Sequence, residues 1–281
     1  MGSITLSGAT TATPDNGTGP ARSSGPGSGF PPKDITEWGE SIEIGNGEIT
    51  TFSSVTPSGK PKHVGIHFAE GTLKNLPYAE DFESGDADGI RIHGFWAKPF
   101  TLAFPTNTPK PITYAGCGWN PQGHTPRGVY TKPHFDLHYY FYAPEVIGDI
   151  GLGVIEDLSD EKIPDGYRLI EGGAIVPKMD AHLAPKNAPE FDDRSDASDW
   201  EETLIWGAAD VDNDGEYENN FVEPMITVDY FENHLTGVER QEIAQPDVYP
   251  KDGYYPTTYT VRHLGDGGYA VVLEDFEERT A

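Results

Sequence analysis

The sequence predicts an all-β fold, a closed or nearly closed barrel or a sandwich, with one or two short helices. The chain carries 33 glycines and 24 prolines among its 281 residues, a composition typical of many turns. Short runs rich in β-branched and aromatic residues recur along it, while helical periodicity is weak throughout. Strands so numerous and so closely spaced favour a barrel or a sandwich over a helical fold.

The predicted strands follow one another from residue 41 to residue 273. They are Ser41–Ser53, Lys62–Phe68, Gly89–Phe104, Ile112–Gly116, His134–Tyr142, Glu171–Val176, Thr203–Ala209, Tyr217–Thr227, Thr257–His263 and Tyr269–Leu273. Short helices are predicted only at Glu70–Leu76 and Glu223–His234, where Pro224 would suit the first helical turn.

The first residues differ in composition from the rest. Residues 1–33 are mainly Gly, Ser, Thr, Pro and Ala with no periodic apolar pattern, which predicts a disordered tether. Residues 34–281 are expected to form a single β domain, since all-β domains often reach about 250 residues. A spacer of this kind is typical of an extracellular or cell-surface protein, and we expect any leader or anchor to be removed or absent.

The charge of the chain is strongly negative. Forty-six acidic residues against 19 basic ones give a net charge of −27, and the acids are scattered rather than grouped in runs. This pattern favours the solvated shell of a protein from a salt-adapted organism, with a surface that captures cations or a basic partner as the alternative. It argues against nucleic acid as a partner, and no apolar run is long enough for direct membrane insertion. A single cysteine, Cys117, excludes multi-cysteine metal sites.

The middle of the chain concentrates residues that can bind a metal ion. In the predicted strand His134–Tyr142, side chains alternate, so His134, Asp136 and His138 share one face. Four residues of straight strand span roughly 13 Å, too far for both histidines to bind one ion. Either the strand therefore bulges, or only one histidine pairs with Asp136. A hydrogen-bonded ladder without metal is the alternative.

Four segments carry a resemblance to a known family. They are Asn120-Pro121-Gln122-Gly123-His124, Pro133–Tyr140, Val176-Pro177-Lys178-Met179-Asp180-Ala181-His182 and Phe221-Val222-Glu223-Pro224-Met225-Ile226-Thr227. In this order they resemble an uncharacterised prokaryotic β-barrel domain family, one bacterial member of which is encoded beside an anti-sigma factor of the extracytoplasmic stress response. The resemblance covers roughly Lys62 to His234. It implies an all-β fold, an extracytoplasmic setting and ring-like assembly into a homo-oligomer, but no reaction.

The positions that match this family include residues able to bind metal. We predict a site formed by His134, His138, His182 and Glu223, with Asp136 orienting a histidine and His124 as an outer candidate. Three histidines and a glutamate suit a divalent transition metal, zinc first, with manganese, iron or copper as alternatives. For Glu223, the competing interpretation is a carboxylate at a helix start.

An acidic turn departs from the family pattern. Asp210, Asp212 and Asp214 alternate before Gly215, as at the start of a calcium-binding loop, but Phe221 stands where that loop needs its last carboxylate. We expect an Asp-Gly hairpin turn instead.

Three functions remain open on this evidence. The first is an extracytoplasmic metal-binding protein without turnover. The second is a mononuclear metalloenzyme of the hydrolase, lyase or oxygenase type, which needs an open coordination position and a small-molecule ligand. The third is a structural assembly protein without metal. No catalytic acid–base pair stands out in the sequence, and the catalytic residues stay unknown.

Overall fold

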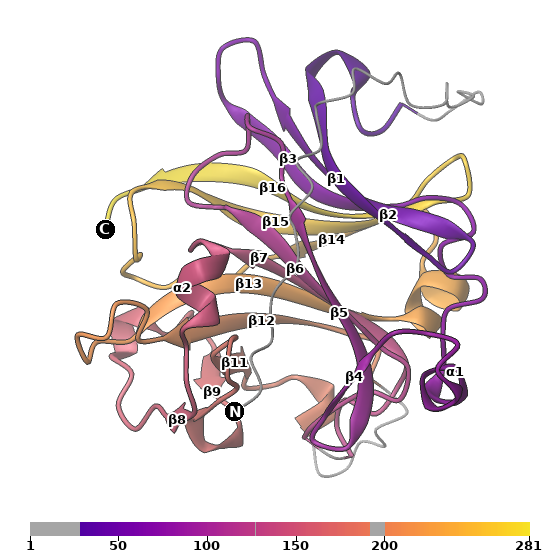
Figure 1. Ribbon diagram of the computed structural model, residues 1–281. Helices are drawn as coiled ribbons and strands as arrows, with labels where there is room; N and C mark the ends of the chain where they lie inside the picture. Colours follow the sequence, from indigo (N-terminus) through magenta and orange to yellow (C-terminus); the bar gives the residue numbers. More distant parts are fainter. Residues whose placement is uncertain (1–28, 127, 192–199) are drawn as a thin grey trace, which may run out of the picture.

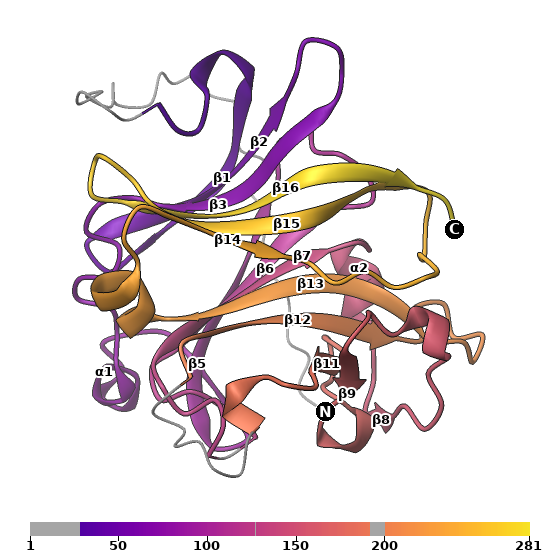
Figure 2. The same ribbon diagram turned by 180° about the vertical axis from the view of Figure 1, so that it is seen from behind.

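The fold is a pair of facing β-sheets. A computed structural model describes residues 29–126, 128–191 and 200–281, so most of the predicted tether 1–33 lies outside the described residues. Two large antiparallel sheets, with six and eight strands, lie one above the other in Figures 1 and 2. Neither sheet closes on itself. The predicted all-β fold is confirmed, in the form of a sandwich rather than a closed barrel.

The six-stranded sheet joins the two ends of the described chain. Its order is β1-β2-β3-β16-β15-β14. The strands are β1 (Thr36–Ile44), β2 (Gly47–Val55), β3 (Pro61–Phe68), β14 (Val238–Glu242), β15 (Gly253–His263) and β16 (Tyr269–Arg279).

The eight-stranded sheet is built from the middle of the chain. Its order is β4-β5-β6-β7-β13-β12-β11-β9. The strands are β4 (Ile90–Ile92), β5 (Phe95–Ala103), β6 (Tyr114–Asn120), β7 (His134–Tyr140), β9 (Tyr167–Leu169), β11 (Ala181–Pro185), β12 (Glu202–Ala209) and β13 (Glu218–Thr227). A separate pair, β8 (Gly153–Val154) and β10 (Ala174–Ile175), lies beside it. The α-helices are short, α1 (Ala79–Ser84) and α2 (Pro144–Gly148).

The main core lies between the two large sheets. The ring of Phe135 on β7 packs edge-on against that of Phe68 on β3, with centroids 5.2 Å apart. Further along β7, the Tyr139 hydroxyl donates to the carbonyl of Val271 on β16, at 2.8 Å. Because strand side chains alternate, Leu137 faces the core with these two residues, whereas Asp136 and His138 face the opposite side of the sheet.

A smaller core covers the outer face of the six-stranded sheet. Phe52, Leu264, Ala270 and Val272 are buried there. Gly65 lies between Phe52 and Val272 in the sheet, and a Cβ built on it would lie 2.4 Å from Cζ of Phe52. The glycine therefore makes room for the ring.

Gly65→Ala should destabilise the protein by roughly 1–3 kcal/mol, because the fully buried Phe52 ring has to move. Urea denaturation followed by tryptophan fluorescence measures this free energy. Gly148→Ala is the control, since a Cβ there meets nothing within 4 Å. Equal stability of the two variants would contradict the packing described.

His63 on β3 makes stability depend on pH. Burial lowers its pKa to about 4, against the opposing charge of Glu274 and together with the charges of Arg262 and Lys62. The unfolded chain accepts a proton near pH 6.5, whereas the folded protein resists it down to about pH 4. Stability should therefore be full above pH 6.5 and fall as the pH decreases toward 4, by roughly 1–3 kcal/mol. Urea denaturation at pH 7 and 4.5 should show a smaller loss for His63→Gln than for the wild type; equal losses would count against His63 as the cause.

Several predicted elements need correction. The predicted helix Glu223–His234 is wrong in its first half, because Glu223 and Pro224 lie inside β13. The chain turns helical only from Val228, and Tyr230–His234 is a π-helix. Turns replace the predicted helix Glu70–Leu76. No helix in the described ranges is long and apolar enough to span a bilayer.

One predicted strand is also shorter than expected. Of the predicted strand Glu171–Val176, only Ala174–Ile175 is extended, because a 3₁₀ turn occupies Glu171–Gly173. Three further 3₁₀ turns lie at Lys33–Ile35, Asp160–Lys162 and Pro189–Phe191.

Candidate metal centre

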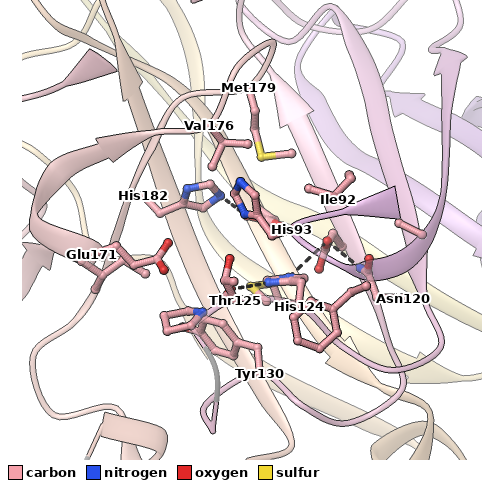
Figure 3. A pocket seen from close by; sticks show the side chains of 17 residues that line it. Ile92, His93, Asn120, His124, Thr125, Tyr130, Glu171, Val176, Met179 and His182 are labelled. Atoms are coloured by element: carbon pink, nitrogen blue, oxygen red, sulfur yellow. Dashed lines mark hydrogen bonds and ion pairs between the residues drawn. The ribbon is translucent and has the colours of Figure 1, made fainter. Parts of the chain in front are cut away.

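The polar side chains of β7 face a pocket outside the sandwich core. Asp136 and His138 lie on the face opposite Phe135 and Tyr139, and both line a hollow of the eight-stranded sheet. Residues of β4, β5, β6, β7, β11 and β13 line the same hollow, and Figure 3 shows the side chains that surround it. Side chains far apart in sequence therefore converge there.

The hollow has two adjoining parts. One has a cavity volume of about 80 Å³, and Glu223 and His182 are among its polar lining residues. The other, of about 380 Å³, is lined by His138 and shares Asp136 with the first. Apolar side chains make most of the wall of the first part. A largely apolar pocket with a few convergent polar groups is the usual form of a small-molecule site.

His138, His182 and Glu223 form one cluster, here called the His138 group. Nε2 of His138 lies 3.3 Å from Oε1 of Glu223, and Nε2 of His182 lies 3.8 Å from Oε2. One ligand atom of each residue lies within 4.8 Å of the others. Donor atoms bound to one zinc ion at about 2.1 Å lie roughly 3.4 Å apart in a tetrahedron. The cluster therefore needs only small shifts to hold one ion.

Hydrogen bonding fixes the tautomer of His138. Its Nδ1 lies 3.1 Å from the carbonyl oxygen of Gly116 on β6. A carbonyl oxygen only accepts, so Nδ1 carries the hydrogen, and in the neutral ring Nε2 is left with a lone pair that faces Glu223. Metal-binding histidines have this arrangement, in which a backbone carbonyl holds the nitrogen that does not bind the ion.

Two atoms of the His138 group are buried without a hydrogen-bond partner. They are Nε2 of His138 and Oε2 of Glu223, in residues that are 4% and 1% exposed. Burial raises the pKa of Glu223 well above its usual range, with the charges of Asp136 and Asp180 acting in the same direction. Burial lowers the pKa of His138 to about 4 and of His182 to about 3. The histidines are thus neutral at pH 7, as metal binding requires.

The strand register brings Glu223 to His138. Pairing of Val222 with Tyr139 and of Met225 with Asp136 places Glu223 opposite His138. The β13–β7 pairing is interrupted at Glu223 and Pro224, where proline has no N–H to donate. The proline is therefore tolerated in a central strand at a gap in the ladder, next to the carboxylate of the cluster.

His182 reaches the same place from β11, across β12. It pairs with Gly207, which in turn pairs with Phe221 on β13. A Cβ built on Gly207 would lie 1.9 Å from the carboxyl group of Asp180. The missing side chain of Gly207 thus leaves room for the fully buried carboxyl group of Asp180.

His124, His134 and Asp136 form a second cluster, here called the His134 group. Nε2 of His134 lies 3.0 Å from Oδ1 of Asp136, and Nε2 of His124 lies 3.5 Å from Oδ2. The side-chain amide of Asn120 donates to Oδ2 at 2.7 Å. Despite its burial, Asp136 has a pKa well below its usual range, because the charges and hydrogen bonds of His124 and His134 oppose the burial.

Two glycines on β6 lie opposite residues of the two groups. Gly116 lies opposite His138, and Gly118 lies opposite Asp136. A Cβ on Gly118 would lie 3.4 Å from Oδ2 of Asp136, and one on Gly116 would lie 2.6 Å from the Tyr140 ring. Larger side chains at these positions would crowd the ring and carboxylate atoms of the pocket face.

The acidic turn between β12 and β13 does not resemble a completed calcium site. Asp210, Asp212 and Asp214 lie close enough to hold an ion, but Asp210 already accepts hydrogen bonds from the backbone N–H groups of Asp214 and Gly215. These bonds explain the turn without an ion. Residues 210–217 connect the two strands, which pair as a hairpin.

The predicted site residues divide between the two groups. His138, His182 and Glu223 come together, whereas His134 lies with His124 and Asp136. The sequence left two alternatives for this strand, a bulge or the pairing of only one histidine with Asp136. The observed grouping agrees with the second, since His134 but not His138 lies with Asp136. Asn120, which binds Asp136, and the buried Asp180 were not predicted. Asn120 lies in a segment that the sequence singled out, but its role depends on a cross-strand neighbour.

No protein-family model, curated protein or solved structure matches this chain in the comparisons made. The resemblance to an uncharacterised family therefore stays a prediction. The chemistry of the pocket has to be argued from its own residues.

Proposed function

We propose that this protein binds one divalent transition metal ion through His138, His182 and Glu223, at the floor of the pocket. The observation that carries the proposal is the pair of buried ligand atoms without partners, Nε2 of His138 and Oε2 of Glu223. Leaving such atoms unpaired costs roughly 1–3 kcal/mol each. A bound cation removes this cost, because it accepts the lone pairs of both atoms.

The ligand types indicate which metals fit. Two imidazoles and one carboxylate suit zinc, and the same set with open positions is typical of non-haem iron(II) sites. The absence of thiolate from the group argues against a site built for copper(I). Zinc is the first candidate, with manganese and iron next.

Metal analysis tests the proposal directly. Protein purified at high salt without chelators or affinity nickel should be stripped, then titrated with zinc, manganese or iron(II) and analysed for bound metal per chain. His182→Ala should lose one equivalent relative to the wild type. His263→Asn is the control, because His263 lies on β15 of the other sheet, outside both groups. Unchanged stoichiometry in His182→Ala would overturn the proposal.

A metalloenzyme is the second candidate, and the pocket favours it. Three protein ligands leave at least one coordination position open, and Glu223 and His182 line a mostly apolar cavity. A small molecule with an apolar body and one coordinating group would suit this cavity. With cobalt(II) in the site, azide should change the visible spectrum if a position is open; a spectrum unaffected by azide would favour a closed binding site without turnover.

A further inference from the structure

We propose that the His134 group binds a second metal ion beside the first, so that the centre is binuclear. The inference rests on the proposed function of the His138 group, which it extends from one ion to two. The second ion would be bound by His124, His134 and Asp136.

The first argument is the tautomer of the two histidines. Nδ1 of His134 lies 2.7 Å from the carbonyl oxygen of Lys132, and Nδ1 of His124 lies 2.5 Å from that of Thr125. Both Nδ1 atoms therefore carry hydrogen. Both Nε2 atoms therefore face Asp136 while Nδ1 is held by a backbone carbonyl, the arrangement also found for His138, and a metal ion would replace any hydrogen on Nε2.

The second argument is an unpaired carboxylate atom. Asp136 is 8% exposed, and its Oδ1 has no aligned hydrogen bond although Nε2 of His134 lies 3.0 Å away. Asn120 binds only the other oxygen, Oδ2. The amide of Asn120 also lies 3.4 Å from Nε2 of His134, so Oδ1 of Asp136 is the buried atom of this group that has no hydrogen-bond partner. A cation bound there would be the partner of Oδ1 and would complete a set of two imidazoles and one carboxylate.

The third argument is the position of the two groups. Asp136 and His138 are two residues apart on one face of β7, a step of roughly 7 Å. Asp136 lines both parts of the hollow, whereas Glu223 and His138 each line one. Two ions held there would share one cavity and lie near enough for their unpaired electrons to interact.

The test counts and locates the ions. Stripped wild-type protein titrated with manganese(II) in excess calcium, which occupies weak oxygen sites such as the acidic turn, should bind two equivalents. Its electron paramagnetic resonance spectrum should show spin coupling between neighbouring ions. Asp136→Asn should bind one equivalent and lose the coupling. Asp212→Asn, in the acidic turn, is the control and should keep both.

The outcomes separate the two proposals. One equivalent in the wild type, unchanged by Asp136→Asn and lost in His182→Ala, would overturn the binuclear centre and leave the first site standing. Two equivalents that His182→Ala does not reduce would overturn the first site. If Asp136→Asn does not fold, His124→Gln is the second variant, because His124 is only partly buried at the edge of the group. It should also bind one equivalent less than the wild type.

Discussion

Glu223→Gln should weaken metal binding at the His138 group by about 100-fold or more, since loss of partners outside the ligand shell alone costs roughly 10- to 100-fold. The amide keeps the shape of the carboxyl group but cannot supply an anionic oxygen. Competition against a coloured chelator measures the affinity. The wild type should also gain about 2.7 kcal/mol of stability at a metal concentration 100 times its dissociation constant. The variant should gain little.

The metal-free variant should be as stable as the metal-free wild type. Burial raises the pKa of Glu223 and so favours its neutral form when no ion is present, and the amide of the variant is also neutral. Glu190→Gln is the matched control, because Glu190 is also buried but accepts from Thr203 at 2.5 Å and belongs to neither group. It should bind metal like the wild type. Equal losses in both variants would point to a general effect on the fold.

Phe135→Ala should destabilise the metal-free protein by about 3–5 kcal/mol. The ring is fully buried and lies between Phe68 of the facing sheet and Trp119 of its own, with centroids 5.2 and 4.9 Å away. Its removal leaves a cavity in the main core that rigid neighbouring strands fill poorly. Urea denaturation in the presence of a chelator measures the loss.

The same variant tests whether packing in the main core and metal binding in the pocket are independent. Phe135 lies between His134 and Asp136 in sequence but on the opposite face of β7. At low urea, where the variant is still folded, it should therefore bind as much metal as the wild type. Phe135→Leu should cost less than Phe135→Ala, about 1–1.5 kcal/mol. A loss below about 1 kcal/mol for Phe135→Ala would mean that the two sheets do not share this core.

Much of the fold could be predicted because the alternation of polar and apolar residues identifies strands in the sequence. On β7, the alternation in sequence placed the polar and apolar residues on the faces where they lie. Pro224 misled the prediction, because proline at a helix start is common and proline in a central strand is rare. Only the interrupted β13–β7 pairing, a property of two strands together, explains it.

The site could be predicted by residue type but not by grouping. The sequence identified His138, His182 and Glu223, yet it could not show that His134 belongs with His124. The rise per residue of a strand indicated that His134 and His138 lie too far apart to bind one ion. The partner of each histidine, however, depends on the register of the neighbouring strands. The strand position of His182 was the hardest to predict, because β11 has only five residues and ends in proline.

The wall of the pocket comes from other parts of the chain than its floor. Ile92 on the edge strand β4, and Val176 and Met179 in the segment before β11, line the hollow, whereas His138 and Glu223 lie on inner strands (Figure 3). Edge strands and loops tolerate substitution and insertion better than paired inner strands do. Evolution can therefore change which molecules enter this cavity while the reactive groups stay constant, so that descendants of one ancestor could diverge in specificity and still share their chemistry.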